Sequence, residues 1–236
     1  MNLKRFIGKL RRARDVVRLK ARISYSQAGE DIIIDALFEN LKRQETTYLD
    51  IGANDPLICN NTYLLYKKGW RGVLVEPDAA MCEVAKSKRS EDTIVNIGIG
   101  LSNESEAPFY VFPGRLNTWN TFSKEEAGIR ETASGIKAKQ ISVPLKTINN
   151  IIEQYFPACP NFISVDVEGL DLDILKSLDF NRFRPDVFCV ETISFSINNE
   201  GKKLDDVQEF LSSKDYFVYA DTHINTIFCN TDLLNK

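Results

Sequence analysis

Apolar and polar positions along the chain follow two patterns that alternate. Short apolar runs rich in β-branched residues predict strands, and apolar positions three and four residues apart predict helices. A first helix is expected over residues 25–41, with Ser24 or Ser26 as a cap at its start. The strands that follow are expected over 47–53, 72–78, 93–100, 161–169, 185–191, 216–222 and 226–230. The helices between them are expected over 61–70, 79–89, 147–156, 172–178 and 203–213.

Strands that are separated by single helices pair in parallel through right-handed crossovers. The last two strands differ, because only residues 223–225 join them. A connection this short is a hairpin, so the final strand runs antiparallel. The predicted fold class is α/β, a doubly wound, Rossmann-like sheet that is mostly parallel and ends in a C-terminal antiparallel hairpin. Such sheets bind ligands at the carboxyl ends of their strands, where the strand order reverses.

Residues 101–146 interrupt this alternation. Two strand-like runs, APFYVF and QISVPL, flank a polar stretch that contains Arg115, Asn117, Trp119 and Asn120. We expect the segment to be an insertion over the sheet that shapes an acceptor pocket. Trp119 is a candidate for stacking on a sugar, because aromatic faces suit polyhydroxylated ligands, whereas Trp70 is expected in the core.

The spacing of apolar residues over the N-terminal residues 1–22 predicts a basic amphipathic helix. They hold nine basic residues and one acid, a net charge of +8, so the remaining chain carries −11 within a total of −3. One interpretation places this helix on an anionic membrane surface or an acidic partner. The other docks it on the acidic body of the same protein. It lacks the apolar centre of a signal peptide, so a cytoplasmic location is expected.

Length and composition limit the remaining choices. The 236 residues, 43% of them hydrophobic, fit one domain over 23–236 after the basic helix. No apolar run approaches the ~20 residues that span a bilayer. The small net charge argues against a nucleic-acid partner. The five cysteines lack the spacing of a zinc site and suit a reducing compartment, with Cys189 and Cys229 expected in the core.

Acidic residues end the first two predicted strands, at Asp50 and at Glu76. Glu76 stands 24 residues after Gly52, close to the ~20-residue spacing at which an acid reaches ribose hydroxyls in nucleotide-binding folds. The glycine-rich G-x-G-x-x-G loop that binds a pyrophosphate is absent, since Asn54 and Leu57 replace its later glycines. These features favour S-adenosylmethionine (SAM), which has no phosphate and carries two positive groups that carboxylates attract.

Six stretches of the sequence, in order, resemble the FkbM family of SAM-dependent methyltransferases. They cover residues 24–192 and read YSQAGEDIII, YLDIGAND, NNTYLLYKKGWRGVLVEPD, VNIGIG, FISVDVEGLDLDILKSL and PDVFCVE. The resemblance implies a class I methyltransferase sheet and methyl transfer to oxygen, usually on glycans, glycolipids or polyketide natural products.

The same resemblance implies where the cofactor lies. It places Asp50 and Gly52 at the methionine end, Glu76 on the ribose, and Asn96 to Gly98 near the adenine. Ser26, Gln27, Glu30 and Asp31 fall on the family's SQxGED segment, which closes over the cofactor. Asp55 and Pro56 depart from the glycine-rich loop of many members, which weakens the methionine-end assignment. The predicted cofactor-binding residues are Gln27, Asp31, Asp50, Gly52, Asn54, Glu76, Asp78, Asn96 and Gly98.

Methyl transfer to a hydroxyl requires alignment and a group that accepts the proton. The catalytic candidates lie at the carboxyl ends of the later predicted strands: Asp166 and Glu168 end the fourth, Glu191 ends the fifth and His223 follows the sixth. Asp166 and Glu168 share one side of the extended strand, and Asp166 is the preferred base or acceptor-orienting carboxylate because it lies nearer the methyl group than Glu168. The alternative is that these acids hold the turn or cap the next helix.

Asp166 and Glu191, with Glu168 as a third candidate, also suit a magnesium ion that would lower the pKa of the hydroxyl. The alternative for these acids is a purely structural role at the strand ends. The alternative for His223 is a turn residue with a solvated imidazole. The leading hypothesis is therefore a SAM-dependent O-methyltransferase acting on a glycan or glycolipid hydroxyl. Its rivals are methylation of a small secondary metabolite or of nitrogen, a non-catalytic SAM-binding partner in a biosynthetic assembly, and a Rossmann protein that binds another cofactor.

Overall fold

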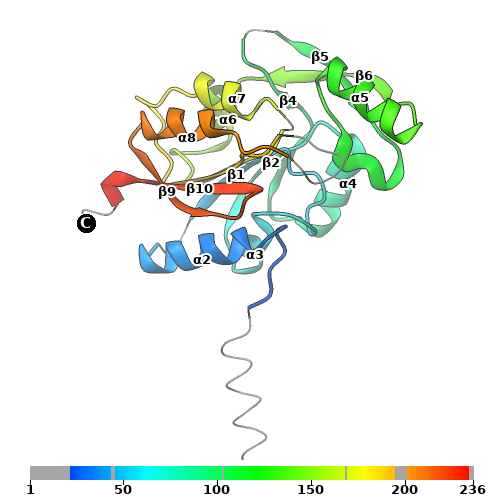
Figure 1. Cartoon of the computed structure of the whole chain (residues 1–236). Coiled ribbons are helices and arrows are strands. Elements are labelled where there is room, and N and C mark those ends of the chain that lie inside the picture. The colour runs from blue at the N-terminus through cyan, green and yellow to red at the C-terminus, as the bar shows by residue number, and fades with distance from the viewer. Residues whose placement is uncertain (1–21, 44–45, 103, 168, 195–200, 234–236) are drawn as a thin grey trace, which may run out of the picture.

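A central sheet of seven strands forms the body of the protein (Figure 1). The computed structural model describes residues 22–43, 46–102, 104–167, 169–194 and 201–233. The strand order is β3-β2-β1-β7-β8-β10-β9. Its strands are β1 (Thr47–Ile51), β2 (Arg71–Val75), β3 (Thr93–Val95), β7 (Phe162–Val165), β8 (Val187–Glu191), β9 (Tyr216–Asp221) and β10 (Asn225–Asn230). Only β10 runs antiparallel to the other six strands, which confirms the predicted α/β sheet and its C-terminal hairpin.

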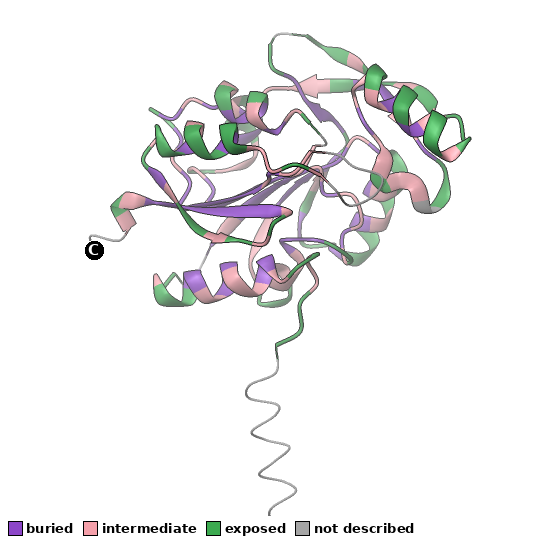
Figure 2. Ribbon diagram, in the orientation of Figure 1, coloured by how far each residue is buried: buried purple, intermediate pink, exposed green. Residues whose placement is uncertain are grey.

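Helices cover both faces of this sheet (Figure 1). One face is covered by α2 (Glu30–Asn40), α3 (Tyr63–Lys67) and α4 (Ala79–Lys88), and the other by α6 (Ile148–Tyr155), α7 (Asp171–Ser177) and α8 (Asp205–Ser212). Successive side chains of β1 point to opposite faces of the sheet. Leu49 and Ile51 therefore pack in the core beneath α6, α7 and α8, whereas Tyr48 packs in the core beneath α2, α3 and α4. Buried residues concentrate on the strands and on the inner sides of the helices (Figure 2).

A second, three-stranded sheet lies beyond the edge formed by β3. It consists of β4 (Gly98–Ile99), β6 (Lys139–Lys146) and β5 (Glu106–Val111), in the order β4-β6-β5. The prediction of one strand over 93–100 was therefore wrong, because the chain leaves the central sheet after Val95 and Gly98 pairs with Leu145 instead. The β5 and β6 strands agree with the two strands expected inside residues 101–146.

The polar stretch between β5 and β6 holds two helices that the apolar pattern did not predict. These are the 3₁₀ helix η1 (Gly114–Trp119) and the α-helix α5 (Lys124–Ser134). Few apolar residues of α5 are buried, so its periodicity is weak. Its ends nevertheless carry a recognisable signal: the Ser123 hydroxyl accepts a hydrogen bond from the Glu126 amide, and Gly135 ends the helix in the left-handed region.

The first helix begins later than the predicted residue 25. The α2 helix starts at Glu30, after Gly29 with φ 96°. Of the two candidate serines, Ser26 caps its first turn, because its hydroxyl oxygen accepts from the Gly29 and Asp31 amides at 3.1 and 3.3 Å. Both serine hydroxyls also donate to the Asp31 carboxylate, which accepts from the Tyr25 amide as well. The carboxylate thus folds residues 24–26 back on the helix start.

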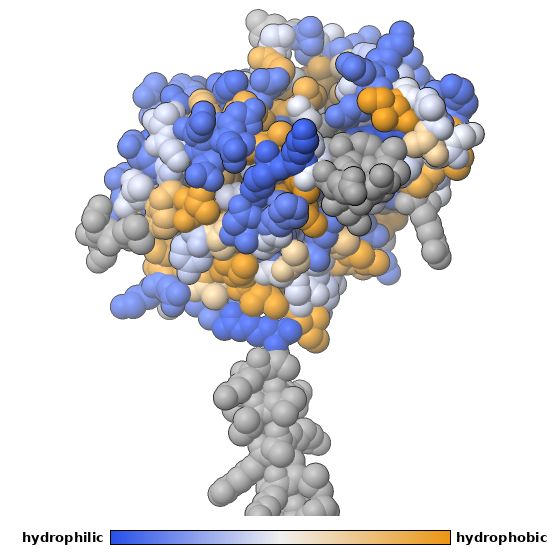
Figure 3. All heavy atoms as spheres, in the orientation of Figure 1, coloured by the Kyte–Doolittle hydropathy of each residue, from blue (hydrophilic) through white to orange (hydrophobic). Residues whose placement is uncertain are grey.

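The predicted basic helix over 1–22 lies outside the described residues except for Arg22. Among the residues that are described, no helix combines the length and apolar character needed to cross a bilayer. Large apolar side chains that are exposed are scattered along the chain, and on the face in Figure 3 hydrophobic patches alternate with hydrophilic ones. Cys189 and Cys229 are buried and not paired with another cysteine, as expected.

Candidate active site

A cleft of about 560 Å³ opens at the carboxyl ends of β1, β2, β7 and β8. Its floor comes from the turns that follow these strands, and η1 with the residues after it closes one side. Among its lining residues are eight that the sequence had singled out: Gln27, Gly52, Asn54, Glu76, Gly98, Trp119, Asp166 and Glu191. The topology therefore brings together residues that are far apart in the chain.

Gly52 makes the turn after β1 possible. Its φ is 79°, a left-handed conformation that favours glycine. A Cβ at this position would also collide with the backbone carbonyl of Asp166. Gly98 has a similar role on the other side of the cleft, since a Cβ there would meet the side chains of Phe122 and Leu145. Both glycines thus allow close packing in the cleft wall, Gly52 against the end of β7 and Gly98 against two side chains.

Glu76 ends β2 as a buried carboxylate that lines the cleft. Its two oxygens accept hydrogen bonds from the amides of Asn54 and Asp78, each at 2.7 Å. Burial raises the pKa of Glu76 to about 7, although these two amide donors oppose the shift. Asn96 does not line the cleft, but its amide donates to the carbonyls of Glu76 and Pro77 at 2.9 Å and so fixes the end of β2.

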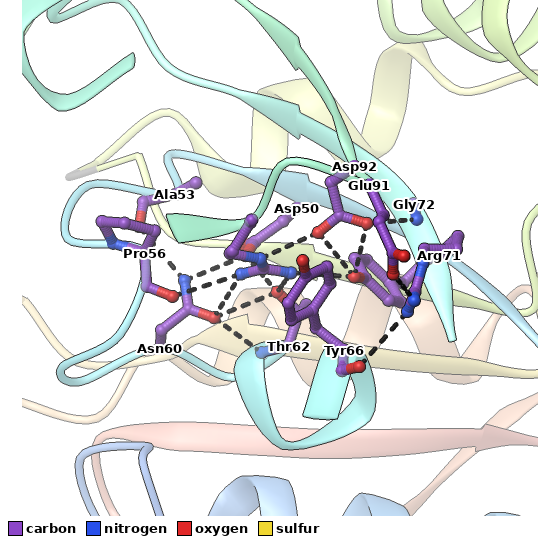
Figure 4. Close-up of polar contacts among 12 residues, drawn as sticks. Asp50, Ala53, Pro56, Asn60, Thr62, Tyr66, Arg71, Gly72, Glu91 and Asp92 are labelled. Atoms are coloured by element: carbon purple, nitrogen blue, oxygen red, sulfur yellow. Dashed lines mark hydrogen bonds and ion pairs between the residues drawn. The ribbon is translucent and has the colours of Figure 1, made fainter. Parts of the chain in front are cut away.

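Asp50 lies beneath the cleft and is not among its lining residues. Its carboxylate accepts hydrogen bonds from the Thr62 hydroxyl at 2.6 Å and the Asn60 amide at 3.1 Å (Figure 4). Burial raises the pKa of Asp50, while the nearby Arg89 guanidinium opposes that shift. The structure thus places Asp50 in a buried polar cluster, and a direct contact with a cofactor stays a prediction.

The SQAGED segment reaches the cleft through Gln27 alone. Asp31 organises residues 24–26, as described above. Glu30 is buried and accepts hydrogen bonds from the Thr222 hydroxyl at 2.7 Å and the Asn225 amide at 3.1 Å, which ties the start of α2 to the β9–β10 hairpin. The two acids of this segment therefore hold Gln27 in place.

Two of the four catalytic candidates lie in the cleft. Asp166 and Glu191 line it, whereas Glu168 lies outside the described residues. His223 is exposed in the β9–β10 turn with φ 75°, and its amide donates to the Asp221 carboxylate. The turn after β7 is held by Asp171, which accepts hydrogen bonds from the amides of Val167 and Gly169, each at 3.2 Å. The sequence did not single out Asp171.

Nothing in the described part of the chain forms a group of three or more His, Cys, Asp or Glu side chains that could hold a metal ion. The pair Asp166 and Glu191 is present in the cleft. Magnesium binding by this pair stays a prediction.

The segment around η1 is joined to both cofactor-side turns. The Asn117 side chain donates to the Asn54 side chain at 3.1 Å, and the Asn120 side chain donates to the Asp78 carboxylate at 3.2 Å. The buried Arg130 of α5 donates to the backbone carbonyl of Trp119 at 2.7 Å. Asp78 itself caps α4 and does not line the cleft. The insertion is therefore part of the site wall.

The family model described as "Methyltransferase FkbM domain" matches residues 50–218, more than half of the chain. No curated protein matches the sequence. Among solved structures, the chain is similar to a TehB-like SAM-dependent methyltransferase from Corynebacterium glutamicum, with 11% identity, a TM-score of 0.44, and 97% of this chain and 100% of that one covered.

Two further structures show comparable likeness. An O-methyltransferase from Bacillus cereus in complex with S-adenosylhomocysteine (SAH) has 11% identity and a TM-score of 0.44, with 94% and 88% of the two chains covered. A Burkholderia thailandensis 1,6-didemethyltoxoflavin-N1-methyltransferase has 10% identity and a TM-score of 0.42, with 96% and 84% covered. The fold class of this chain rests on its own strand order.

Proposed function

The chain belongs to the FkbM family of SAM-dependent methyltransferases, and we propose that it methylates a hydroxyl oxygen of a glycan, glycolipid or related sugar-containing acceptor. The observation that carries this proposal is the shared cleft. A buried carboxylate at the end of β2 and two carboxylates at the ends of β7 and β8 open into it together. The first suits the ribose of SAM, and the other two suit an acceptor hydroxyl.

The cofactor side of the cleft consists of Gly52, Glu76 and Gly98 in this proposal. Glu76 holds the ribose hydroxyls, and the two glycines let the cofactor lie against backbone. Asn96 acts through Glu76, because it fixes the strand end that carries the carboxylate. SAM supplies an electrophilic methyl group on a sulfonium. Every further step depends on how the chain aligns the acceptor with it.

Asp166 and Glu191 orient the acceptor hydroxyl and take up its proton. As the acceptor oxygen forms its bond to the methyl carbon, the carbon–sulfur bond breaks and the hydroxyl proton passes to a carboxylate. In-line alignment of the two reactants can supply roughly 7–11 kcal/mol, and a positioned base a further ~10²–10⁴-fold. Asp166 is the preferred base because its backbone also abuts Gly52 on the cofactor side.

The charges of the cleft favour an acceptor without an anionic group near the reacting hydroxyl. Within the described residues, the charged side chains that line it are all carboxylates: Asp55, Glu76, Asp166 and Glu191. Carboxylates repel a phosphate or another carboxylate and tolerate sugar hydroxyls. A neutral sugar residue therefore fits better than a phosphorylated one.

The deciding experiment incubates the protein with methyl-labelled SAM and a panel of neutral oligosaccharides, glycolipids and nucleotide sugars, with and without EDTA. We expect an O-methylated product that Asp166→Asn greatly reduces. Loss of product in EDTA, restored by added magnesium, would show that the reaction needs a divalent cation, for which Asp166 and Glu191 are the candidate ligands. A folded protein that binds no SAM, or a product labelled only on nitrogen, would contradict the proposal.

We also propose that the basic residues 1–22 bring the enzyme to an anionic membrane surface, where glycolipid acceptors are found. The support is the net charge of +8 over this stretch. Co-sedimentation with vesicles of anionic and of zwitterionic lipid tests the idea, with a variant lacking residues 1–22 as control. Binding to anionic vesicles that persists after this deletion would contradict it.

A further inference from the structure

The loop from Ala53 to Thr62, which follows the turn at Gly52, lines the cleft with part of its length and is held in an unusual conformation. Asn54 and Cys59 have positive φ values of 42° and 54°, although neither is a glycine. Both line the cleft. Non-glycine residues keep such backbone angles only where surrounding contacts enforce them. Asn54 is held partly from the cleft side, by Glu76 and Asn117. A second group of contacts reaches the loop from residues that do not line the cleft.

Arg89, at the end of α4, is the centre of these contacts. Its side chain is fully buried and donates in two directions. Toward the loop it donates to the Pro56 carbonyl at 3.4 Å, the Asn60 side-chain oxygen at 3.0 Å and the Thr62 hydroxyl at 2.9 Å. Toward the sheet it donates to the Tyr48 hydroxyl at 2.9 Å and the Asp92 carboxylate at 2.8 Å. A guanidinium has enough donors in one plane to serve both sides.

Asn60 transmits this anchoring to both ends of the loop. Its side-chain nitrogen donates to the Asp50 carboxylate at 3.1 Å and to the Ala53 carbonyl at 3.2 Å. Its side-chain oxygen accepts from Arg89 and from the Thr62 amide. Its backbone amide donates to the Tyr25 carbonyl at 3.0 Å, which joins the loop to the segment that carries Gln27. All polar atoms of this side chain are thus used, none of them in the cleft.

We infer that Arg89 and Asn60 are positioning residues for the cofactor, because they set the conformation of the 53–62 loop from behind without lining the cleft. The inference rests on the proposed placement of SAM in this cleft. It also gives Asp50 a role that needs no contact with ligand, as the buried acceptor that holds Asn60. Without the two anchors the loop would relax from its positive φ angles and the cleft wall would lose its shape.

The test uses Asn60→Ala, with Tyr48→Phe as its matched control. Both remove polar contacts of the same buried cluster, but only Asn60 bonds to the loop. SAM binding is measured by titration calorimetry at a temperature where near-UV circular dichroism shows both variants to be folded. We expect Asn60→Ala to weaken SAM binding about tenfold or more and Tyr48→Phe to change it less than about twofold, since a buried hydrogen-bond network can be worth that much to one element.

Hydrogen exchange provides a readout that does not depend on SAM. In Asn60→Ala the amides of residues 53–59 should exchange faster, while those of β1 keep wild-type protection. Arg89→Lys is the second variant, because a single ammonium can donate to only part of the cluster. We expect its SAM affinity and its loop protection to lie between those of the wild type and those of Asn60→Ala. SAM affinity and loop exchange that both match wild type in Asn60→Ala would overturn the inference. A wild-type protein that fails to bind SAM would overturn the proposed function instead. The exchange rates of the loop amides would then still show whether Asn60 and Arg89 hold the loop.

Discussion

The backbone carbonyl of Asp166 occupies the space that a side chain at Gly52 would need. The two residues end neighbouring parallel strands, β1 and β7, and the Asp166 amide donates to the Ile51 carbonyl at 3.0 Å. The turn proposed to receive the cofactor and the residue proposed as base are therefore packed against each other. A substitution at Gly52 should therefore also displace the backbone of Asp166.

Gly52→Ala should destabilise the protein and abolish SAM binding. The new methyl group would collide with the Asp166 carbonyl, and alanine tolerates the φ of 79° poorly. We expect a loss of about 2 kcal/mol or more in the free energy of unfolding, measured by urea denaturation. Gly135→Ala is the matched control, because its φ of 69° is similar but a Cβ there has open space around it. Equal losses in the two variants would show that close packing at Gly52 has no role.

The pH dependence of SAM binding should report Glu76. Burial raises the pKa of this carboxyl to about 7, so it is largely protonated below that pH, and only the ionised form accepts from two ribose hydroxyls. Affinity for SAM should therefore increase as the pH rises from 6 to 8. At pH 8 the affinity of Glu76→Gln for SAM should be lower than that of the wild type by about tenfold or more. The increase in affinity between pH 6 and pH 8 should disappear in this variant.

The same group should affect the stability of the ligand-free protein in the opposite direction. The unfolded carboxyl ionises near its ordinary pKa of 4.5, whereas the folded one keeps its proton up to about 7. The folded state thus binds more protons between these values, and the free energy of unfolding falls as the pH rises through this window. Urea titrations at several pH values should show a smaller decrease in Glu76→Gln than in wild type.

Asp166→Asn should lower kcat for O-methylation by about 10²–10⁴-fold, because an amide cannot accept the hydroxyl proton. Its affinity for SAM should stay within about threefold of wild type, as calorimetry would show. His223→Gln separates the two interpretations of the histidine. Its exposed position in the hairpin turn predicts nearly unchanged kcat. A loss as large as that of Asp166→Asn would place the base at His223 instead.

The carboxylates of the cleft should discriminate against anionic molecules. Trp119 lines the cleft, and Trp70 is the other tryptophan of the chain, so Trp70→Phe leaves one fluorescent reporter. Caesium ions should quench Trp119 more strongly than iodide does, relative to a free indole, and Asp166→Asn with Glu191→Gln should reduce the difference. For any accepted sugar, its phosphate monoester should have a higher KM. Stronger quenching by iodide would contradict a negatively charged cleft.

Much of the fold followed from local patterns. The strands of the central sheet and the helices that cover it alternate in the sequence as in space. Each could be predicted because its own apolar face gives it a distinct periodicity. The apolar pattern gave a wrong prediction where tertiary contacts override the local preference of the chain. Residues 93–100 read as one strand, yet Gly98 pairs with Leu145 of another sheet. The α5 helix buries little apolar surface, so only its caps at Ser123 and Gly135 reveal it.

The candidate site divides in the same way. The sequence by itself determined that acidic residues end several strands and that Gly52 begins a tight turn, since both follow from strand order and residue type. Only the tertiary structure decided which acids face the cleft. Asp50 and Glu76 both end strands, but Asp50 meets Asn60 and Thr62 beneath the loop, whereas Glu76 opens into the cleft. The reason is that a buried polar group needs hydrogen-bond partners, and those partners come from segments that only folding brings together.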